Sequence, residues 1–542
     1  MIVDLDHDDS LDPDRVGAKS ASLARAKRAG LPVLPGLVVE SLASRGHMAL
    51  GAATLPTRGS GGARLAITSR PIGFADELVT AACSMSDSLV ARSSTLLESS
   101  GEWSGAFTSY VDVAPDQLPK AVVGCWASAF TVAALQRQEA AGTTPGSLDM
   151  AVLVQPFLDA TVGGTAELAA NGSTVVRAAK GSPAPLLQGW VKGVEGRADP
   201  DGSWYGQDLI DLVGISALNR VRDSLSRAYA IMGSNHCEWA IDEEPWILQL
   251  DVLRRPDPAP PLPSIEIPAD LMPTIRALVA APGRLGEELV LPWALGGIPQ
   301  HDASPDLIPQ VDVGATKKLA QTLTSQVWGM DHASASMQAR RLLDRLKGSE
   351  PHKSVDRIRS LNRPNPELSR DLLARIAALQ TRMVESGAAP DTQAAWHLSL
   401  SDIAEVLNGQ ARRVPNRVGR QPWEPLIASA VLEHGTRHHG SPAASGIGAG
   451  IRMRADNPGK AMLTHRGVIS ASQPLASLAQ LLWDAAGLVT RGGSPAAHLF
   501  ESARSLGIPA VCGVDLGGDQ DQIVAVDGYS GVVATLPLRH AV

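Results

Sequence analysis

Hydrophobic and polar positions follow different periods in different parts of the chain. In the first part, residues 17–29 place Leu23 and several alanines on one helical face, and Gly30 is positioned to end that helix. Apolar runs of β-forming residues, bounded by turn residues, predict strands at 37–39, 88–92 and 150–158. Residues 237–253 are predicted to form a hairpin, with two apolar-alternating arms around an acidic turn. The first part is therefore expected to mix helices and strands.

The pattern then becomes helical and later alternates again. Residues 314–347 contain no proline, and residues 366–386 repeat leucine and isoleucine at helical spacing, so the middle is predicted to be mainly helical. Towards the end of the chain, strands are predicted at 487–490, 508–514, 523–526 and 532–536.

Two segments are candidate linkers. Residues 254–268 contain six prolines, and residues 436–450 are rich in Gly, Ser and Ala. Cutting there predicts a multidomain α+β chain with domains at 1–255, 265–435 and 440–542.

Composition narrows the class of protein. The 542 residues are 44% hydrophobic and 19% charged, which argues against wholesale disorder, and the net charge of −8 disfavours a nucleic-acid partner. Four scattered cysteines signal neither a zinc ribbon nor a disulfide framework. The acidic start has no apolar signal region, and no uncharged apolar run reaches the length of a membrane span. We expect a cytoplasmic protein without membrane contact, of open oligomeric state.

The clearest candidate for chemistry is His498. Gly492 and Gly493 predict a turn after a strand, Ser494 suits a helix N-cap with Pro495 in the first turn, and Gly507 ends the helix. A phosphate carried on the imidazole would be stabilised by the helix N-terminus, and the same dipole would keep a ring nitrogen neutral and nucleophilic. A helix-terminal histidine without a role is the alternative.

Residues 491–511, RGGSPAAHLFESARSLGIPAV, resemble the phosphohistidine domain of the superfamily of PEP synthase, pyruvate phosphate dikinase and rifampin phosphotransferase. That pattern runs Gly-Gly, a spacer, Ser/Thr-His, a helix and LGIPAV. Two features depart from it: Ala497 replaces the hydroxyl residue, and one extra residue follows the glycines. The resemblance implies a C-terminal β/β/α swivelling domain in which His498 carries phosphate.

Four earlier segments resemble, in order, the ATP-grasp-like nucleotide domain of the same superfamily: 16–39, 90–113, 150–164 and 237–249. The resemblance implies ATP and Mg²⁺ as ligands. It places Lys19 and Arg92 at the phosphates, Gly105 and Ser109 in the nucleotide cradle, Gln155 near the base, and Glu238 and Gln249 at the metal. Cations that offset the charge of ATP and hard oxygen ligands for Mg²⁺ suit this chemistry, although each residue alone could be an ordinary surface or ladder residue.

One position departs from the nucleotide pattern in a way that matters. The family has arginine two residues after the hairpin glutamine, and this chain has Asp251, which would repel a polyphosphate unless Arg254 or Arg255 compensates. The family's GLGE-type loop is not recognisable either, and residues 177–190 hold that region.

Other histidines are weaker candidates. Glu433, His434, His438 and His439 could ligate a metal if they were helical, but a solvated linker is favoured. Asp331 is expected to cap a helix, while His332 and His397 could act as bases towards an acceptor.

The length of the middle part separates the branches of the superfamily. About 170 residues lie between the two linkers, too few for the PEP-binding TIM barrel of about 250 residues. The chain therefore resembles a compact rifampin phosphotransferase relative, which implies a transferase (a dikinase-type kinase) that moves phosphate from ATP through His498 to an acceptor, with release of AMP and phosphate.

The acceptor is expected to be a small hydroxyl- or amine-bearing molecule rather than pyruvate. Trp328, Met330 and Met337 could contribute to its pocket or belong to an ordinary core. Two other functions remain open: an ATP-grasp ligase or ATP-driven dehydratase that uses phosphorylation only for activation, and a degenerate nucleotide-binding regulator.

Overall fold

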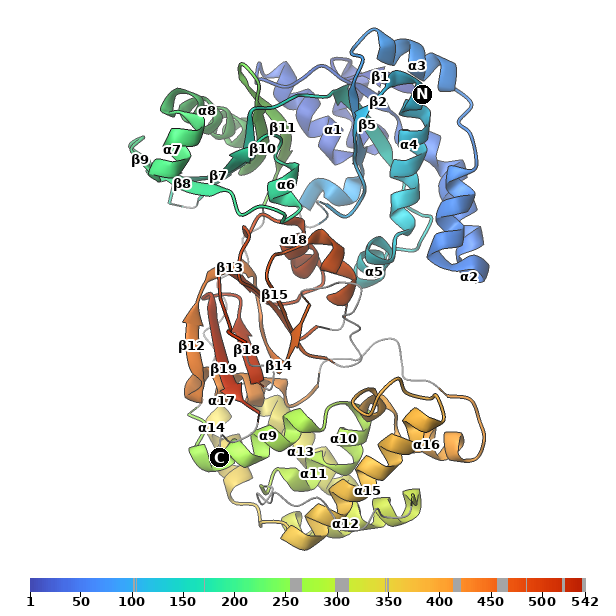
Figure 1. Cartoon of the computed structure of the whole chain (residues 1–542), viewed down its shortest axis with the longest axis vertical. Coiled ribbons are helices and arrows are strands. Elements are labelled where there is room, and N and C mark those ends of the chain that lie inside the picture. The colour runs from blue at the N-terminus through green and yellow to red at the C-terminus, as the bar shows by residue number, and fades with distance from the viewer. Residues whose placement is uncertain are drawn as a thin grey trace. The chain divides into compact units, whose positions relative to one another are not determined.

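The computed structural model describes most of the chain (Figure 1). Contacts between Cα atoms divide the chain into two compact units. The described residues are 1–100, 103, 105–169, 171–253, 266–297, 311–346, 348, 350–412, 421–455, 466–483, 485–518 and 522–538, with side chains left out at 99, 100 and 140. The first unit comprises Met1–Pro256, Gln473–Gln480 and Gly492–Leu506, and the second comprises Asp257–Ser472, Leu481–Arg491 and Gly507–Val542. Each unit contains helices and strands, so the chain is a multidomain α+β protein.

The first unit contains two antiparallel sheets. The five-stranded sheet has the order β1 (Ile2–Asp4), β2 (Leu37–Val39), β5 (Ala151–Pro156), β3 (Leu89–Ser94) and β4 (Tyr110–Val113). The six-stranded sheet has the order β11 (Pro245–Asp251), β10 (His236–Ile241), β6 (Val162–Leu168), β7 (Thr174–Lys180), β8 (Val194–Ala198) and β9 (Trp204–Tyr205). The strands predicted at 37–39, 88–92 and 150–158 and the hairpin within 237–253 are confirmed.

Helix α1 (Pro13–Arg28) contacts both sheets: it packs on β3 and β5 of the five-stranded sheet and on β11 of the six-stranded sheet. Gly17 interrupts it with φ of +74°, and a Cβ at that position would lie 2.2 Å from the backbone oxygen of Ser94. Only glycine permits this backbone conformation and this close approach, so the glycine before Lys19 fixes the helix against β3. The other helices of the unit are α2 (Arg45–Thr68), α3 (Ala75–Cys83), α4 (Leu118–Ala127), α5 (Val132–Ala140), α6 (Ala184–Leu187), α7 (Gln207–Val213), α8 (Ile215–Met232) and α18 (His498–Ser505).

The second unit begins with a block of helices, as the middle of the sequence predicts. Its helices are α9 (Met272–Ala280), α10 (Gly283–Leu289), α11 (Leu291–Ala294), α12 (Val313–Trp328), α13 (His332–Arg345), α14 (Pro351–Arg359), α15 (Pro366–Glu385), α16 (Leu400–Leu407) and α17 (Glu424–His434). Between Glu266 and His434 the described residues contain no strand.

An eight-stranded sheet completes the second unit. Its order is β12 (Thr436–His439), β19 (Val532–Pro537), β18 (Gln522–Asp527), β14 (Ile447–Arg454), β15 (Val468–Ala471), β16 (Gly487–Thr490), β17 (Ala510–Cys512) and β13 (Ser441–Ala444). Strands β14, β15, β16 and β17 run parallel to one another in that order, so their carboxyl ends lie along one edge.

The predicted linker at 436–450 is wrong. This segment forms β12, β13 and the first part of β14, because its small residues fit where backbones approach closely: a Cβ on Gly448 would lie 1.8 Å from the backbone oxygen of Ala486. Ala449 also joins one hydrophobic core with the helical block, together with Ile523 and Ala534 from the sheet. Residues 254–265 of the other predicted linker lie outside the described residues, so that prediction and the domain boundaries stay predictions.

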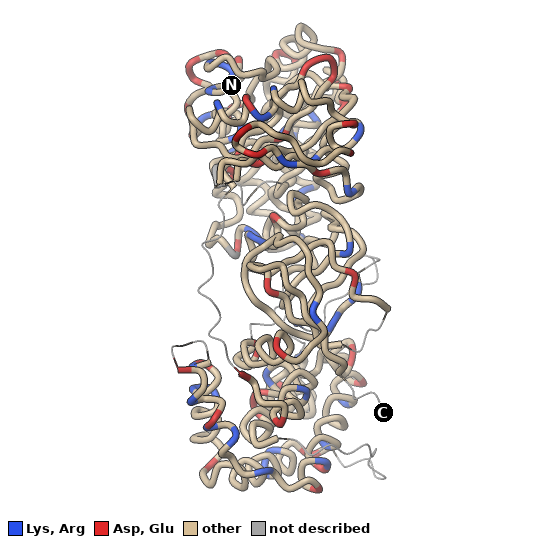
Figure 2. The backbone as a smooth tube through the Cα atoms, turned by 90° about the vertical axis from the view of Figure 1, so that its left-hand side faces the viewer, with Lys and Arg blue, Asp and Glu red and all other residues tan. Residues whose placement is uncertain are grey.

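Charged residues are interspersed along the chain rather than gathered in one long segment (Figure 2). In the part of the chain that the structure describes, no single helix is long and apolar enough to cross a membrane. One pair, Pro115–Phe130 with Val132–Glu139, meets that test by length and composition, with a bend of 52° between its halves.

Candidate active site

His498 is the first residue of α18, in the first unit. Ala497 occupies the N-cap position and has no side chain that could cap, whereas Ser494 forms a turn whose backbone oxygen accepts from Ala497 N at 3.0 Å. The prediction of Ser494 as N-cap with Pro495 at the first helical position is therefore wrong, because the proline-containing stretch forms a turn ahead of the helix. His498 in the first turn and Gly507 just past the C-cap are confirmed.

Glu501, one helical turn after His498, contacts the imidazole and changes its pKa. His498 Nδ1 lies 2.8 Å from Glu501 Oε2, and both side chains are largely buried, with 14% and 5% exposed. Burial disfavours the charged ring, but the carboxylate of Glu501 outweighs burial through its charge and its hydrogen bond, so the pKa of His498 is raised. The expectation that the helix dipole keeps the ring neutral overlooked this carboxylate.

The pair also selects one ring nitrogen. Burial opposes ionisation of Glu501, but the charge and hydrogen bond of His498 outweigh it and lower the pKa of Glu501. An ionised carboxylate can only accept, so Nδ1 carries the proton and Nε2 of the neutral ring holds the lone pair. Nε2 is therefore the nitrogen available as a nucleophile.

The imidazole lies against the loop that the sequence assigned to the nucleotide. Gly105 has φ of +66°, and a Cβ there would lie 2.4 Å from His498 Cγ and 2.5 Å from Nδ1. Glu238 raises the pKa of His498 by its charge and Lys19 lowers it, both less strongly than burial and Glu501. The structure thus brings together the predicted nucleophile, a predicted phosphate ligand and a predicted metal ligand.

Helix α18 is held in this position by further contacts within the first unit. Arg137 of α5 donates from Nε and Nη2 to Ser505 Oγ at 3.2 and 2.9 Å, and its guanidinium stacks 5.6 Å from the ring centre of Trp103. Trp103 stacks in turn on Phe107. The segment around Gly105 therefore contacts both the start of α18 and, through Trp103 and Arg137, its end.

Lys19 and Arg92, the predicted phosphate ligands, both contact other groups of the protein. Lys19 Nζ lies 3.0 Å from Glu98 Oε1 in a pair whose side chains are 7% and 4% exposed. Burial raises the pKa of Glu98, although Lys19 opposes this. Arg92 donates from Nη1 to the backbone oxygen of Leu248 at 2.7 Å, which anchors it on the hairpin strand β11. Burial lowers the pKa of Arg92, and the charge of Glu238 acts against that shift.

The predicted metal ligands face each other across the β10–β11 hairpin. Glu238 and Gln249 are register partners, and both side chains are buried. The described residues contain no group of three or more His, Cys, Asp and Glu side chains arranged to hold a metal. Mg²⁺ commonly takes one or two protein oxygens and completes its shell with phosphates and water, so the oxygens of Glu238 and Gln249 would suffice as protein ligands. The magnesium site stays a prediction.

Asp251, which departs from the family pattern, lies opposite His236, a residue that was not predicted to belong to the site. Its Oδ2 accepts from Gln249 Nε2 at 2.8 Å and lies 3.6 Å from Nδ1 of His236, its register partner. Burial disfavours the His236 cation, but Asp251 outweighs burial and raises the pKa of His236. His236 thus offsets the charge of Asp251, whereas Arg254 and Arg255 lie outside the described residues. The signal was available, because a hairpin centred on the acidic turn puts these two residues opposite each other.

Gln155 and Ser109 are the remaining residues predicted at the nucleotide, and their roles stay predictions. Gln155 is buried on β5 and donates from Nε2 to the backbone oxygen of Leu34 at 3.2 Å. Ser109 is exposed just before β4. The region of the missing GLGE-type loop, 177–190, holds the end of β7 and helix α6.

Asp331 and His332 make hydrogen bonds within the helical block, and His397 is buried. Asp331 caps α13 by accepting from Ser334 N at 3.0 Å, as predicted. His332 contacts Thr324 Oγ1 and the backbone oxygen of Glu288, each at 2.9 Å, so both its ring nitrogens have partners. Burial is the main cause of the lowered pKa of His332. His397 is buried, with 2% exposed.

The four residues considered as a metal cluster do not share a helix. His434 is the last residue of α17 and contacts the backbone oxygen of Ile267, while Glu433 accepts from Ile267 N at 2.6 Å. His438 and His439 lie on strand β12. The predicted linker at this place is thus a helix end joined to a sheet.

The predicted acceptor residues differ in how far they are buried. Trp328 is buried in the helical core and donates from Nε1 to the backbone oxygen of Pro292, whereas Met337 on α13 is 51% exposed. Met330 packs against the core. The acceptor site stays a prediction.

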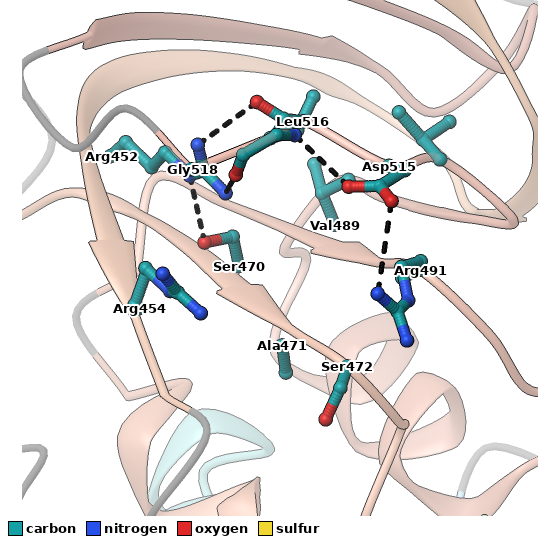
Figure 3. A pocket seen from close by; sticks show the side chains of 12 residues that line it. Arg452, Arg454, Ser470, Ala471, Ser472, Val489, Arg491, Asp515, Leu516 and Gly518 are labelled. Atoms are coloured by element: carbon teal, nitrogen blue, oxygen red, sulfur yellow. Dashed lines mark hydrogen bonds and ion pairs between the residues drawn. The ribbon is translucent and has the colours of Figure 1, made fainter.

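A cavity of about 440 Å³ lies in the second unit, where the carboxyl ends of the parallel strands meet (Figure 3). Arg452 donates there to Ser470 Oγ at 3.1 Å and to the backbone oxygens of Leu516 and Gly517 at 3.1 and 2.9 Å (Figure 3). These bonds tie β14 to β15 and to the loop after β17. The three residues predicted for the acceptor are not among those that line this cavity.

Comparison with known proteins matches two parts of the chain. Residues 72–192 match the AMP/ATP-binding domain of pyruvate phosphate dikinase, and residues 463–531 match the mobile domain of PEP-utilising enzymes. The first contains Arg92, Gly105 and Gln155, and the second contains His498. These two parts of the chain therefore carry an ATP-binding domain and a mobile domain of the kinds found in the superfamily of PEP synthase and pyruvate phosphate dikinase.

A curated relative and a solved structure share smaller parts. The prodigiosin synthesizing transferase PigC of Serratia marcescens is 32% identical over 173 residues, which make up 30% of this chain and 19% of that protein. The match thus spans about a fifth of the relative's length. The crystal structure of Thermococcus kodakaraensis aconitase X in its holo form matches 19% of this chain and 99% of its own at 16% identity, with a TM-score of 0.16 that carries no argument.

Proposed function

We propose that the chain is an ATP-dependent phosphotransferase of the dikinase type, in which His498 accepts a phosphoryl group from ATP and passes it to a small hydroxyl- or amine-bearing acceptor. The observation that carries the proposal is the position of His498 against Gly105, where Lys19 and Glu238 both act on its pKa. Nucleophile, phosphate ligand and metal ligand are then all in the first unit. The ATP-grasp architecture of this unit is part of the proposal.

The residues divide the work of the first half-reaction. Lys19 and Arg92 would hold phosphate oxygens, and Lys19 would exchange its contact with Glu98 for the nucleotide. Glu238 and Gln249 would hold Mg²⁺, which when bound offsets the negative charge of the phosphates. Glu501 keeps the proton on Nδ1, so that Nε2 faces the reaction with its lone pair.

The proposed chemistry balances as two transfers. Nε2 forms a bond to the β-phosphorus of ATP while the bond to the bridging oxygen of the α-phosphate breaks, and AMP leaves with the electron pair. Water then attacks the γ-phosphorus and breaks its bond to the oxygen that bridges it to the β-phosphorus, which releases inorganic phosphate and leaves the β-phosphoryl group on Nε2. The Nε2–phosphorus bond then breaks as the acceptor oxygen or nitrogen attacks, with loss of the acceptor proton. Glu501 stabilises the imidazolium character of the carrier and so favours the second transfer as well.

AMP release tests this function directly. The protein is supplied with Mg·ATP and a panel of small alcohols and amines, with pyruvate as the comparison, and AMP and phosphorylated product are measured. The proposal expects AMP formation that depends on a panel member and a product that keeps the phosphate. Formation of PEP from pyruvate at a rate comparable to the best panel member would overturn the assigned acceptor class.

The relative's name supports a second candidate. PigC is named as a transferase that synthesises prodigiosin, so in that protein the product need not be a phosphate ester. A chain of this second kind would use phosphorylation only to activate a substrate for joining or dehydration. A product that lacks phosphate, formed with AMP and phosphate, would favour it over the dikinase. Retained ATP binding without any turnover would instead identify a regulator.

A further inference from the structure

Glu98 is a buried acidic residue of the first unit that the proposed transfer does not use. It lies in the short 3₁₀ helix Leu96–Ser100, which follows β3 and packs on α1, and its side chain is 4% exposed. Both carboxylate oxygens accept hydrogen bonds: Oε1 from Lys19 Nζ at 3.0 Å and Oε2 from Thr95 N at 2.8 Å. Two accepted bonds, one of them from a cation, fit the ionised carboxylate, so Glu98 is charged while Lys19 is its partner.

The ionisable groups that act on Glu98 come from three elements. Burial is the main cause that raises the pKa of Glu98, and the negative charge of Asp251 on β11 adds to it, whereas Lys19 on α1 opposes both by its charge and its hydrogen bond. Cys125 on α4 also feels the charge of Glu98, but burial raises the pKa of its thiol to about 12, so it stays neutral. Lys19 is therefore the ionisable group that supports the charge of Glu98 in the interior.

A nucleotide in the proposed site would remove this support. If a phosphate oxygen takes Lys19 Nζ, Glu98 is left as a buried charge without its cation. A buried carboxylate that loses its partner is strongly disfavoured and is neutralised instead. The phosphates also bring negative charge to the same place, which favours a neutral Glu98 further.

We propose that nucleotide binding moves Lys19 from Glu98 to a phosphate oxygen, and that Glu98 takes up a proton as it loses this partner. The proton comes from solvent and binds to Oε1, the oxygen that Lys19 leaves, while Oε2 keeps its bond from Thr95 N. Glu98 thus keeps Lys19 paired in the free protein and gives up its charge when the nucleotide binds. The inference rests on the proposed nucleotide site, but not on phosphoryl transfer to His498.

Calorimetry of nucleotide binding to the full-length protein tests the proton uptake. The ligand is Mg²⁺ with α,β-methylene-ATP, in which the bond that His498 would break is blocked, and binding heats are compared in buffers of different ionisation enthalpy at neutral pH. The wild-type protein is expected to take up about one proton more per bound nucleotide than Glu98→Gln. His498 and the ligand can also exchange protons, but they do so in both proteins, so the difference isolates Glu98.

Affinity gives a second measurement with a defined sign. Because protons are taken up on binding, the affinity of the wild-type protein should fall by up to about tenfold for each unit of rising pH in the range where uptake occurs. Glu98→Gln should bind a few-fold more tightly and respond less to pH, since a neutral amide competes less for Lys19 and does not repel the phosphates. Damage to the fold would instead weaken binding.

Glu40→Gln is the matched control. Glu40 also pairs with a cation of α1: its Oε1 lies 2.6 Å from Arg15 Nη2, and its side chain is 15% exposed. This substitution removes an ion pair of the same helix, and it is expected to leave affinity and proton uptake unchanged.

Tighter binding together with lost proton uptake in Glu98→Gln would support the proposal. Equal proton uptake by the wild-type protein and Glu98→Gln, the same changes in Glu40→Gln, or a wild-type affinity that does not fall with rising pH would overturn it. Nucleotide that binds without this uptake would refute the role of Glu98 alone, whereas nucleotide that does not bind would refute the nucleotide site and this inference with it. Proton uptake in a protein that never phosphorylates His498 would support the inference and contradict the dikinase.

Discussion

The first unit and the helical block of the second unit place their ion pairs in different surroundings. In the first unit, groups of opposite charge are paired inside the protein: Lys19 with Glu98, His498 with Glu501 and His236 with Asp251. In the helical block, the pairs Lys353–Glu350 and Arg382–Glu385 lie at the surface, where all four side chains are more than half exposed. Solvent screens the exposed pairs, whereas each buried group depends on its partner.

This difference shows what a ligand must do in the first unit. In the proposed site, ATP has to replace an existing partner of Lys19, so one negative group is exchanged for another. Substitutions at the buried groups of the first unit should therefore act on turnover, whereas those at the exposed pairs of the helical block should change it little.

The largest effect is expected from His498→Ala. Because His498 is the proposed nucleophile and not a nucleotide ligand, AMP formation should fall below about a tenth of the wild-type rate and approach zero, while ATP binding stays nearly intact. Rapid-quench measurement of AMP, with calorimetry of Mg·ATP binding, checks both parts. Retention of more than about a tenth of the wild-type rate would exclude the carrier role.

Lys19→Ala and Glu238→Ala should each lower ATP use by about 100-fold, the scale of losing one charge that stabilises phosphoryl transfer. Lys27→Ala, a partly exposed lysine of the same helix that pairs with Asp6, is the matched control and should keep its activity. Thermal melts distinguish lost chemistry from the unfolding expected when Glu98 loses its partner. Unchanged Mg·ATP affinity and unchanged turnover in both variants would refute the nucleotide site.

Gly105→Ala should slow phosphorylation of His498 by about 5- to 30-fold, because a side chain at positive φ costs about 1–2 kcal/mol and its Cβ would meet the imidazole. Affinity for Mg·ATP should change less than the rate. Single-turnover kinetics measure the rate. A matched substitution at Gly142, which also has positive φ but nothing within 4 Å, reports the cost of backbone strain alone. Equal effects of the two substitutions would mean that Gly105 does not contact the histidine during the reaction.

Glu501→Gln should reduce turnover by about tenfold and shift its dependence on pH. Glu501 raises the pKa of His498, so its loss should move the acidic limb of the rate profile to lower pH, where the neutral ring then first becomes available. The pair stabilises the folded state most between the ordinary carboxyl pKa and the ordinary histidine pKa. This stability is lost as pH rises through the raised pKa of His498 or falls through the lowered pKa of Glu501. The melting temperature of Glu501→Gln should therefore fall most at mildly acidic pH. An unshifted limb would contradict the role of Glu501.

Much of the fold could be predicted from local patterns. Strands such as Leu37–Val39 and Gly487–Thr490 match their predicted bounds, because apolar runs between turn residues determine them. The strands within residues 436–450 could not be predicted in this way. The small residues of this segment resemble those of a linker, and only the close approach of β14 to Ala486 explains them.

The sequence predicted site residues where a residue's type carries the chemistry. His498, Lys19 and Glu238 were predicted in this way; Glu238 and Lys19 act through their charges on the pKa of His498, and the roles of the three residues stay predictions. Glu501 and His236 were missed, since their roles depend on which charged group lies opposite in a helix turn or a hairpin register.

Phosphate on His498 is the most direct test of the account. The protein is incubated with Mg·ATP labelled at the β-phosphate, kept at neutral to alkaline pH, and analysed by mass spectrometry beside His498→Gln and a sample with ATP labelled at the γ-phosphate. The account predicts β-label on His498 with one AMP released per label, no γ-label on the protein once one inorganic phosphate per AMP has been released, and no label on His498→Gln. Label on another residue, γ-label that stays on His498 after that release, or AMP release that leaves His498 unmodified would contradict it.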